Sequence, residues 1–206
     1  SYTPPRHGGD YKGSGVGPSP NYSYSACVAE VYCDSESGFY SVEKIWIAHD
    51  IGQAINEKLV IGQVEGSVYM GLGEAMMEEQ VYWPGKSGIG GLHKNPSMLD
   101  YKSPTSLDMP EIETILAETN DPEGPYGAKE AGQGPLLPVM PAIANAIYNA
   151  VGVRVDEVPI TPDKIYKGLQ NIKSAKKQKH WLPGRIGPTT FPNVEFPEPI
   201  HVDPPC

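Results

Sequence analysis

The first part of the chain alternates apolar and polar residues in the way that half-buried β-strands do. Residues 25–32 and 39–48 are rich in β-branched and aromatic side chains, and a polar turn at 34–38 that ends in glycine separates them. Two such runs around a short turn predict a β-hairpin. Residues 112–118 have the same character, so we expect a third strand there.

The spacing of the apolar residues changes after the hairpin. From about residue 60 to residue 79 they recur at every fourth position, which marks one face of a helix. The residues of this face are Val60, Val64, Val68, Leu72 and Met76, with Ile61 and Ala75 beside them. Four glycines interrupt the same helix, namely Gly62, Gly66, Gly71 and Gly73. Each costs about 1 kcal/mol against alanine in a helix interior, so we expect either close packing of the helix or contact with a ligand.

Two further helices are predicted in the second half of the chain. Residues 138–151 carry an apolar stripe that should face the core, and the stop signal Gly152 follows them. The residues of this stripe are Met140, Ile143, Ala144, Ile147, Tyr148 and Val151. Residues 161–163 (Thr-Pro-Asp) combine an N-cap, a first-turn proline and an acidic residue, which predicts a short helix to about Leu169.

Strands and helices in this order predict an α+β fold, in which a mixed sheet packs against two main helices. The 23 glycines and 22 prolines exceed what such a domain needs. We therefore expect long ordered loops that pack against a cofactor, a partner subunit or both. Residues 171–206 are rich in proline and predict an extended tail. Its aromatic residues Trp181, Phe191 and Phe196 favour a tail that wraps a partner over a disordered one.

Charge and cysteine content argue against several classes of protein. A formal net charge of −9 argues against a nucleic-acid surface, which needs clustered lysine and arginine. No apolar run in the sequence approaches the roughly 20 residues that span a bilayer. The three cysteines, Cys27, Cys33 and Cys206, form no CxxC pair and do not suggest a disulfide framework or an iron–sulfur site. A reducing, cytoplasmic setting is the simplest interpretation.

The familiar catalytic motifs are absent from the sequence, which has no GxSxG elbow, Walker loop, HExxH helix or EF-hand. The five histidines are scattered, and we expect no metal ion held by side chains of this chain. His49 and Asp50 form an adjacent pair at the end of a predicted strand. Such a pair is either an acid–base couple or, more commonly, a tie for a loop. There remain Gly-rich loops before helix N-termini, whose backbone amides can hold a polar, phosphate-bearing ligand.

The order of these loops and helices resembles one known family. The segments that carry the resemblance are 48–56 (AHDIGQAIN), 61–66 (IGQVEG), 70–73 (MGLG), 99–101 (LDY), 124–138 (GPYGAKEAGQGPLLP), 142–146 (AIANA) and 159–162 (PITP). Together they resemble the C-terminal part of the large subunit of the molybdenum hydroxylases, the xanthine dehydrogenase family. The starting residues YTPP and the sequence of residues 124–130 (GPYGAKE) look closest to the α subunit of 4-hydroxybenzoyl-CoA reductase.

The resemblance implies a cofactor and residues that bind it. Gly62 and Gln63 would lie against the pterin of a molybdopterin cofactor that carries molybdenum, expected in its cytosine dinucleotide form. The loop with Lys129, Ala131 and Gly132 would approach the metal itself. Residues 1–170 would then be the C-terminal portion of a molybdenum-cofactor-binding domain, and 171–206 the tail that wraps a partner.

The resemblance also implies a substrate path and partner subunits. Leu99, Tyr101 and Tyr126 would line the substrate funnel. The [2Fe–2S] clusters and the FAD of this family belong to separate subunits. The family's large subunit is also far longer than this chain, so we expect a separately encoded subunit or a fragment, bound in a multi-subunit complex with the remainder of the molybdenum-binding subunit.

One position departs from the family pattern. The hydroxylases of the family carry a glutamate, which acts as the catalytic base, where this chain has Gln133. A glutamine amide cannot accept a proton at neutral pH. Glu130 lies three residues earlier and could replace the base if the loop is helical; otherwise it pairs with Lys129 or with a partner chain. Gln133 and Glu130 are therefore the candidate catalytic residues.

These features predict a subunit or fragment of a molybdopterin-dependent oxidoreductase that acts on an aromatic or heteroaromatic ring. We expect reductive dehydroxylation of the 4-hydroxybenzoyl-CoA reductase type, because a reductase needs a proton donor and an orienting group more than it needs a base. Two alternatives stay open. One is a purine, nicotinate or aldehyde hydroxylase subunit, and the other is a non-catalytic subunit that only scaffolds such a complex.

Overall fold

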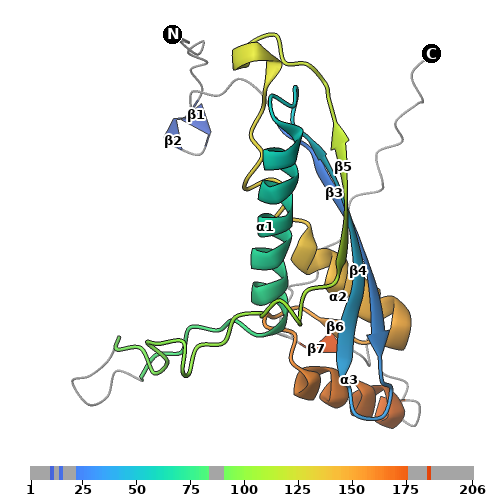
Figure 1. The fold of residues 1–206 in the computed structure, drawn as a ribbon. Coiled ribbons are helices and arrows are strands. Elements are labelled where there is room, and N and C mark those ends of the chain that lie inside the picture. The colour runs from blue at the N-terminus through green and yellow to red at the C-terminus, as the bar shows by residue number, and fades with distance from the viewer. Residues whose placement is uncertain (1–9, 12–13, 16–21, 84–90, 176–184, 187–206) are drawn as a thin grey trace.

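A three-stranded mixed sheet forms the centre of the fold (Figure 1). The computed structural model describes residues 10–11, 14–15, 22–83, 91–175 and 185–186. Within them, strand β4 (Tyr40–Asp50) lies between β3 (Ser25–Cys33) and β5 (Glu111–Ala117). β3 is antiparallel to β4, whereas β5 is parallel to it. The three predicted strands and the predicted α+β class with a mixed sheet are confirmed.

The predicted hairpin joins β3 to β4 through a turn that side chains stabilise. The Asp34 carboxylate accepts hydrogen bonds from the backbone N–H groups of Glu36 and Ser37, at 3.0 and 3.3 Å. Gly38 has φ +77°, in the left-handed region that favours glycine. A Cβ atom on Gly38 would lie 2.6 Å from the Pro162 carbonyl oxygen. The hairpin turn therefore packs directly on the start of the third helix.

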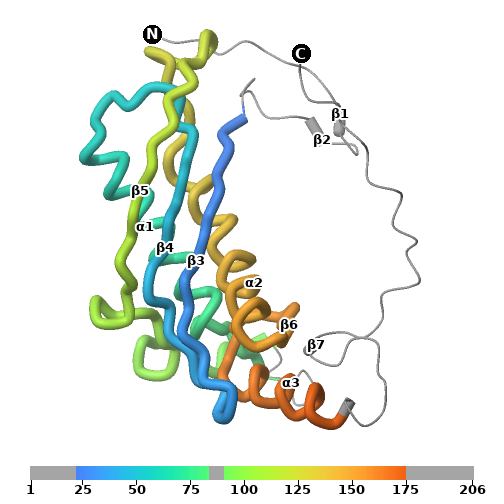
Figure 2. The backbone as a smooth tube through the Cα atoms, turned by 90° about the vertical axis from the view of Figure 1, so that its right-hand side faces the viewer, coloured from blue at the N-terminus to red at the C-terminus, as the bar shows by residue number. Residues whose placement is uncertain are grey.

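Helices α1 (Glu57–Met76) and α2 (Val139–Val151) pack side by side on one face of the sheet (Figures 1 and 2). α1 begins where the Asn56 side chain accepts a hydrogen bond from the Leu59 backbone N–H at 3.1 Å, as an N-cap does. α2 ends at Gly152, whose φ of +74° confirms the predicted stop signal.

The core lies between this face of the sheet and the two helices. Fully buried apolar side chains come from β4, α1 and α2, namely Ile45, Ile47, Val64, Val68, Leu72, Ala75, Ile143 and Ile147. Burial of each Val, Leu or Ile side chain contributes about 1.5–3 kcal/mol. One predicted core residue is wrong: Tyr148 is 45% exposed, and its ring stacks under the Arg154 guanidinium at 4.2 Å. An aromatic ring that stacks on a cation is stable at the surface. The apolar spacing alone therefore placed Tyr148 in the core wrongly.

The third helix is longer than its sequence pattern predicts. α3 (Pro162–Ala175) begins at the predicted Thr-Pro-Asp signal but continues past Leu169. Ile165 and Leu169 are buried, and Ile172 packs partly buried against the same core. The apolar stripe therefore includes one more turn, which the polar residues at 170–171 conceal in the sequence.

Two small sheets complete the described elements. β1 (Asp10–Tyr11) pairs antiparallel with β2 (Ser14–Gly15), and β6 (Arg154–Val155) pairs in parallel with β7 (Arg185–Ile186). β7 belongs to the predicted tail, but Trp181, Phe191 and Phe196 lie outside the described residues. Among the helices of the described part of the chain, none has the length and apolar character to cross a membrane.

We predict that Gly71 is fixed by helix packing. A Cβ atom on Gly71 would lie 2.7 Å from the Val139 Cβ atom on α2, so Gly71→Ala should lower the free energy of unfolding by about 1–3 kcal/mol. Gly66→Ala on the same helix is the matched control. Its new Cβ atom meets nothing within 4 Å and should stabilise the helix by about 1 kcal/mol. Urea denaturation of the two variants would contradict this prediction if both changed stability in the same direction.

Candidate functional site

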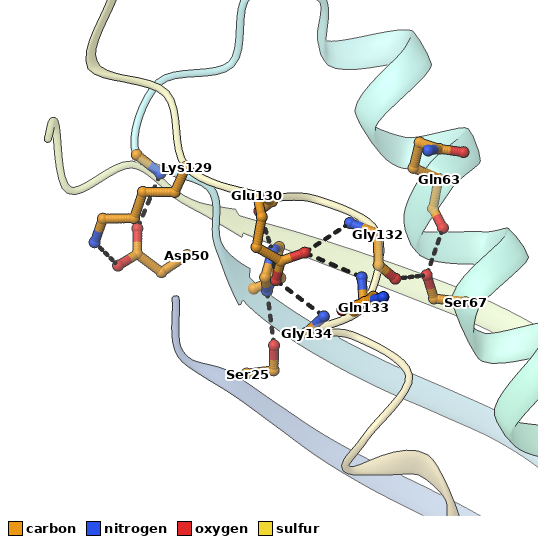
Figure 3. Close-up of polar contacts among 11 residues, drawn as sticks. Ser25, Asp50, Gln63, Ser67, Lys129, Glu130, Gly132, Gln133 and Gly134 are labelled. Atoms are coloured by element: carbon orange, nitrogen blue, oxygen red, sulfur yellow. Dashed lines mark hydrogen bonds and ion pairs between the residues drawn. The ribbon is translucent and has the colours of Figure 1, made fainter. Parts of the chain in front are cut away.

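Asp50, the last residue of β4, holds the loop that follows β5. Its carboxylate accepts a hydrogen bond from the Lys129 ammonium at 2.5 Å (Figure 3) and another from the Thr119 hydroxyl at 2.6 Å. The Lys129 and Asp50 side chains are only 12% and 9% exposed. Burial raises the pKa of Asp50, but the bonds from Lys129, Thr119 and the Gly52 N–H outweigh it and hold that pKa well below its usual value. The ion pair is therefore a fixed part of the loop.

His49, one residue earlier, holds the same loop from the buried side of the sheet. Its ring is fully buried, and Nε2 lies 2.8 Å from the Glu130 carbonyl oxygen. A carbonyl oxygen only accepts, so Nε2 carries a proton and, in the neutral ring, Nδ1 accepts the Ser25 hydroxyl proton at 2.7 Å. The predicted His49–Asp50 pair thus ties a loop.

The loop then closes on itself around the Glu130 side chain. Its carboxylate accepts hydrogen bonds from three consecutive backbone N–H groups, those of Gly132, Gln133 and Gly134, at 3.0, 3.0 and 2.9 Å (Figure 3). The predicted catalytic residues Glu130 and Gln133 are therefore brought together, but the contact runs from the Glu130 carboxylate to the Gln133 backbone. The Gln133 side chain is exposed.

Ser67 ties the loop to α1. Its hydroxyl lies 2.5 Å from the Gly132 carbonyl oxygen and 2.8 Å from the Gln63 carbonyl oxygen one turn earlier in the helix (Figure 3). This tie holds the loop at Gly132 against α1 one turn after Gln63, whose side chain is exposed.

A cavity of about 220 Å³ opens between the start of α1 and the loop at 128–131. Three of the predicted cofactor-binding residues line it, namely Gln63, Lys129 and Ala131. The other residues that line it are Ile51, Gln53, Ile55, Asn56, Leu59, Val60 and Ala128. The structure therefore joins the two segments, far apart in sequence, that were predicted to contact one cofactor.

The glycines of this region divide into two kinds. A Cβ atom on Gly62, Gly66 or Gly132 would meet nothing within 4 Å, so packing within the described chain does not explain these glycines. A Cβ atom on Gly71 or Gly73 would instead clash. Open glycine surface beside the exposed Gln63 amide, which both donates and accepts hydrogen bonds, fits close approach of a large polar ring system such as a pterin.

The predicted substrate-funnel residues are not brought together by this chain. Tyr101 donates a hydrogen bond from its hydroxyl to Glu78 at 2.6 Å, just beyond the C-terminal end of α1, and Leu99 in the same loop is 81% exposed. Gln63 lies about 20 Å away along the helix. Tyr126 lies in the 3₁₀ turn η2 (Pro125–Gly127), near the opposite end of the domain, and is 88% exposed (Figure 1).

The residues that anchor the loop could not be predicted from the sequence. Ser25 lies in β3, Ser67 in α1 and Thr119 just beyond the end of β5. Their hydroxyl groups bond to groups 24 to 69 positions away. Nothing in a single sequence marks such contacts. The only available signal was the His49–Asp50 pair, to which two of these hydroxyl groups bond.

A family model described as "Molybdopterin cofactor-binding domain" matches residues 2–110, which is more than half of the 206 residues. The chain belongs to this family. The matched range covers β3, β4 and α1, and thus the Gln63 side of the cavity. Membership in the molybdenum-binding domains of the xanthine dehydrogenase and aldehyde oxidoreductase family is established, and so is the corresponding α+β fold.

Relatives of this molybdopterin-binding chain are much longer than it is. A putative xanthine dehydrogenase molybdenum-binding subunit of Escherichia coli (strain K12) is 40% identical over 127 residues, 62% of this chain and 16% of that protein. The aldehyde oxidoreductase structure from Desulfovibrio desulfuricans has a TM-score of 0.64 and 34% identity over 77% of this chain and 16% of its own. The structure of quinoline 2-oxidoreductase from Pseudomonas putida 86 has a TM-score of 0.61 and 29% identity over 68% of this chain and 18% of its own. The chain therefore spans less than one fifth of each of these relatives.

We predict that Asp50 makes stability depend on pH. Its folded pKa lies below the usual value of 3.8, so its contribution is present above about pH 4 and is lost as the pH falls further. Asp50→Asn should lower the free energy of unfolding at pH 7 by about 3–5 kcal/mol, because it leaves the Lys129 ammonium buried without its anion. Urea denaturation between pH 7 and pH 3 should show a shallower pH slope for this variant than for the parent. Equal slopes, or the same loss in the exposed control Asp100→Asn, would contradict the prediction.

Proposed function

We propose that this chain forms one side of the cofactor site of a molybdopterin-dependent oxidoreductase that acts on an aromatic or heteroaromatic ring. The observation that carries the proposal is the cavity between α1 and the loop at 128–131, which Gln63 and Ala131 line. The open glycines Gly62 and Gly132 adjoin these two lining residues in sequence. Family membership supports it, as do relatives whose names describe xanthine, aldehyde and quinoline oxidoreductases.

In this proposal Gln63 and Gly62 contact the pterin, while Ala131 and Gly132 contribute the side of the site that approaches the metal. Lys129 acts differently from the sequence expectation, because its ammonium is bound to Asp50 and Thr119 and serves the site by holding the loop. The bound molybdenum cofactor supplies the electron transfer and the oxygen chemistry. The residues of this chain supply shape and hydrogen bonds.

Partner chains follow from the same proposal. We infer a cofactor in the cytosine dinucleotide form, and [2Fe–2S] clusters and FAD on partner subunits, as the family resemblance implies. The three cysteines of this sequence are one fewer than the four thiolates that hold a [2Fe–2S] cluster. The face of the sheet opposite the helices supports a complex. Val28, Tyr32 and Ile115 on it are half exposed or more, which is typical of a surface that another chain segment covers.

The direction of the reaction depends on Gln133. Its exposed amide can orient a substrate but cannot accept a proton, which favours reductive removal of a ring hydroxyl, as in 4-hydroxybenzoyl-CoA reductase, over hydroxylation. The second candidate function is oxidative hydroxylation of a purine, nicotinate or aldehyde substrate. The names of the xanthine dehydrogenase and aldehyde oxidoreductase relatives favour it.

We predict that Gly62→Ala separates cofactor binding from folding. The added methyl group meets no atom of the described chain, and alanine should stabilise α1 by about 1 kcal/mol in the metal-free protein. If the pterin lies against Gly62, the same variant should lose most of its molybdenum per chain, measured by elemental analysis of the purified complex. Glu74→Ala, exposed near the other end of α1, should retain its molybdenum. A fully assembled complex that contains no molybdenum even in the parent protein would instead favour a scaffolding subunit.

We predict that Gln133→Glu changes the direction of the reaction. A carboxylate at this position can accept a proton, so the variant should hydroxylate aromatic rings faster and reduce hydroxylated rings more slowly than the parent, by about 10-fold or more. Both rates are measured on the molybdenum-loaded complex with a panel of aromatic and heteroaromatic substrates. Unchanged rates in both directions would eliminate Gln133 as the determinant.

A further inference from the structure

The Glu130 carboxylate fills an anion site made by its own loop. Three consecutive N–H groups that point at one anion form an amide nest, here those of Gly132, Gln133 and Gly134. Oε2 accepts two of these bonds and Oε1 accepts the third. Hydrogen bonds to an ionised acceptor are stronger than those to a neutral one. The carboxylate therefore determines the backbone conformation of the segment that follows it.

The surrounding contacts leave this arrangement little freedom. The His49 ring nitrogen Nε2 binds the Glu130 carbonyl oxygen, and the hydroxyl of Ser67 on α1 binds the Gly132 carbonyl oxygen. A Cβ atom on Gly134 would lie 2.3 Å from Glu130 Oε1 and 2.7 Å from a ring carbon of His49. Glycine is thus required at 134 because the carboxylate and the imidazole pass directly beside its backbone.

We infer that Glu130 is a positioning residue, which occupies the amide nest in cis and so holds Ala131 at the cavity and the Gln133 side chain at the surface. This inference rests on the proposed function for the importance of Ala131 and Gln133, but the contact itself does not. It replaces the catalytic base that the sequence suggested at Glu130. A carboxylate whose two oxygens accept three backbone N–H groups is committed to its own loop.

A carboxylate that fills an amide nest can be replaced by a small anion after truncation, whereas a free surface carboxylate leaves no such site. The Glu130 side chain is 47% exposed, so small solutes can reach the nest once the side chain is removed. Truncation leaves three N–H groups pointing at a vacant site of carboxylate size. Acetate should enter that site in Glu130→Ala and restore the loop. It should not restore Glu130→Gln, because the amide of that variant still fills the site.

The test uses hydrogen exchange of the purified complex, followed by mass spectrometry on peptides that cover residues 132–134. Glu130→Ala should exchange these amides about 10- to 100-fold faster, because each loses a charge-assisted bond. Acetate should recover most of the protection and the molybdenum retained per chain, whereas chloride at equal ionic strength should not. Glu36→Ala, which removes an exposed carboxylate from the hairpin turn, is the matched control and should leave the exchange unchanged.

Unchanged exchange in Glu130→Ala, or equal recovery with acetate and chloride, would overturn the inference. Recovery of Glu130→Gln by acetate would overturn it as well. The outcome is separable from that of the proposed function. Faster exchange with acetate recovery in a complex that never contains molybdenum keeps the role of Glu130 and eliminates the cofactor site.

Discussion

Two consecutive residues at the end of β4 determine where the loop at 118–134 lies. Side chains of neighbouring strand residues point to opposite faces, so Asp50 and His49 bind consecutive loop residues, Lys129 and Glu130, from two sides. Parallel pairing of β4 with β5 makes this possible, because it places Ala117 opposite Asp50 where β5 ends. The loop therefore leaves the sheet and returns to it at the same point, and the cavity forms where it meets α1.

Glycine serves two opposite purposes in this domain. Gly71 and Gly134 are required by atoms of the chain itself, which approach too closely for a Cβ atom. Gly62, Gly66 and Gly132 face open space. The two that lie in α1 make the helix about 2 kcal/mol less stable than alanine would, and no packing within the described chain offsets that loss. That cost has a physical reason only if something outside the described chain comes close. Gly62 and Gly132 adjoin the cavity-lining residues Gln63 and Ala131 in sequence, which indicates where it does.

Periodic elements could be predicted from the sequence, whereas the site could be predicted only in part. The four-residue repeat located α1, and alternation located the hairpin, because burial of one face imposes a period on the residues. The period misleads at Tyr148, where stacking on a cation replaces burial, and it is hidden at Ile172, where polar neighbours conceal the last turn. The bonds from the Glu130 carboxylate to three backbone amides depend on the φ and ψ angles of a loop. Loop angles follow no period, so the contact stays invisible until the structure is known.

The charge of the cavity limits what this chain alone can recognise. Among the described residues that line it, the single cation is Lys129, and Asp50 neutralises that charge. The amide nest, which would otherwise attract an anion, already holds Glu130. What remains in the lining is the side-chain amides of Gln53, Asn56 and Gln63 together with apolar side chains, of which Ile55 and Leu59 are both about two-thirds exposed. Apolar side chains that exclude water strengthen the hydrogen bonds of a neighbouring amide. This side of the site is therefore suited to the neutral, hydrogen-bonding edge of a ring system. The phosphates of the proposed dinucleotide cofactor would need cationic or amide partners from segments beyond this cavity.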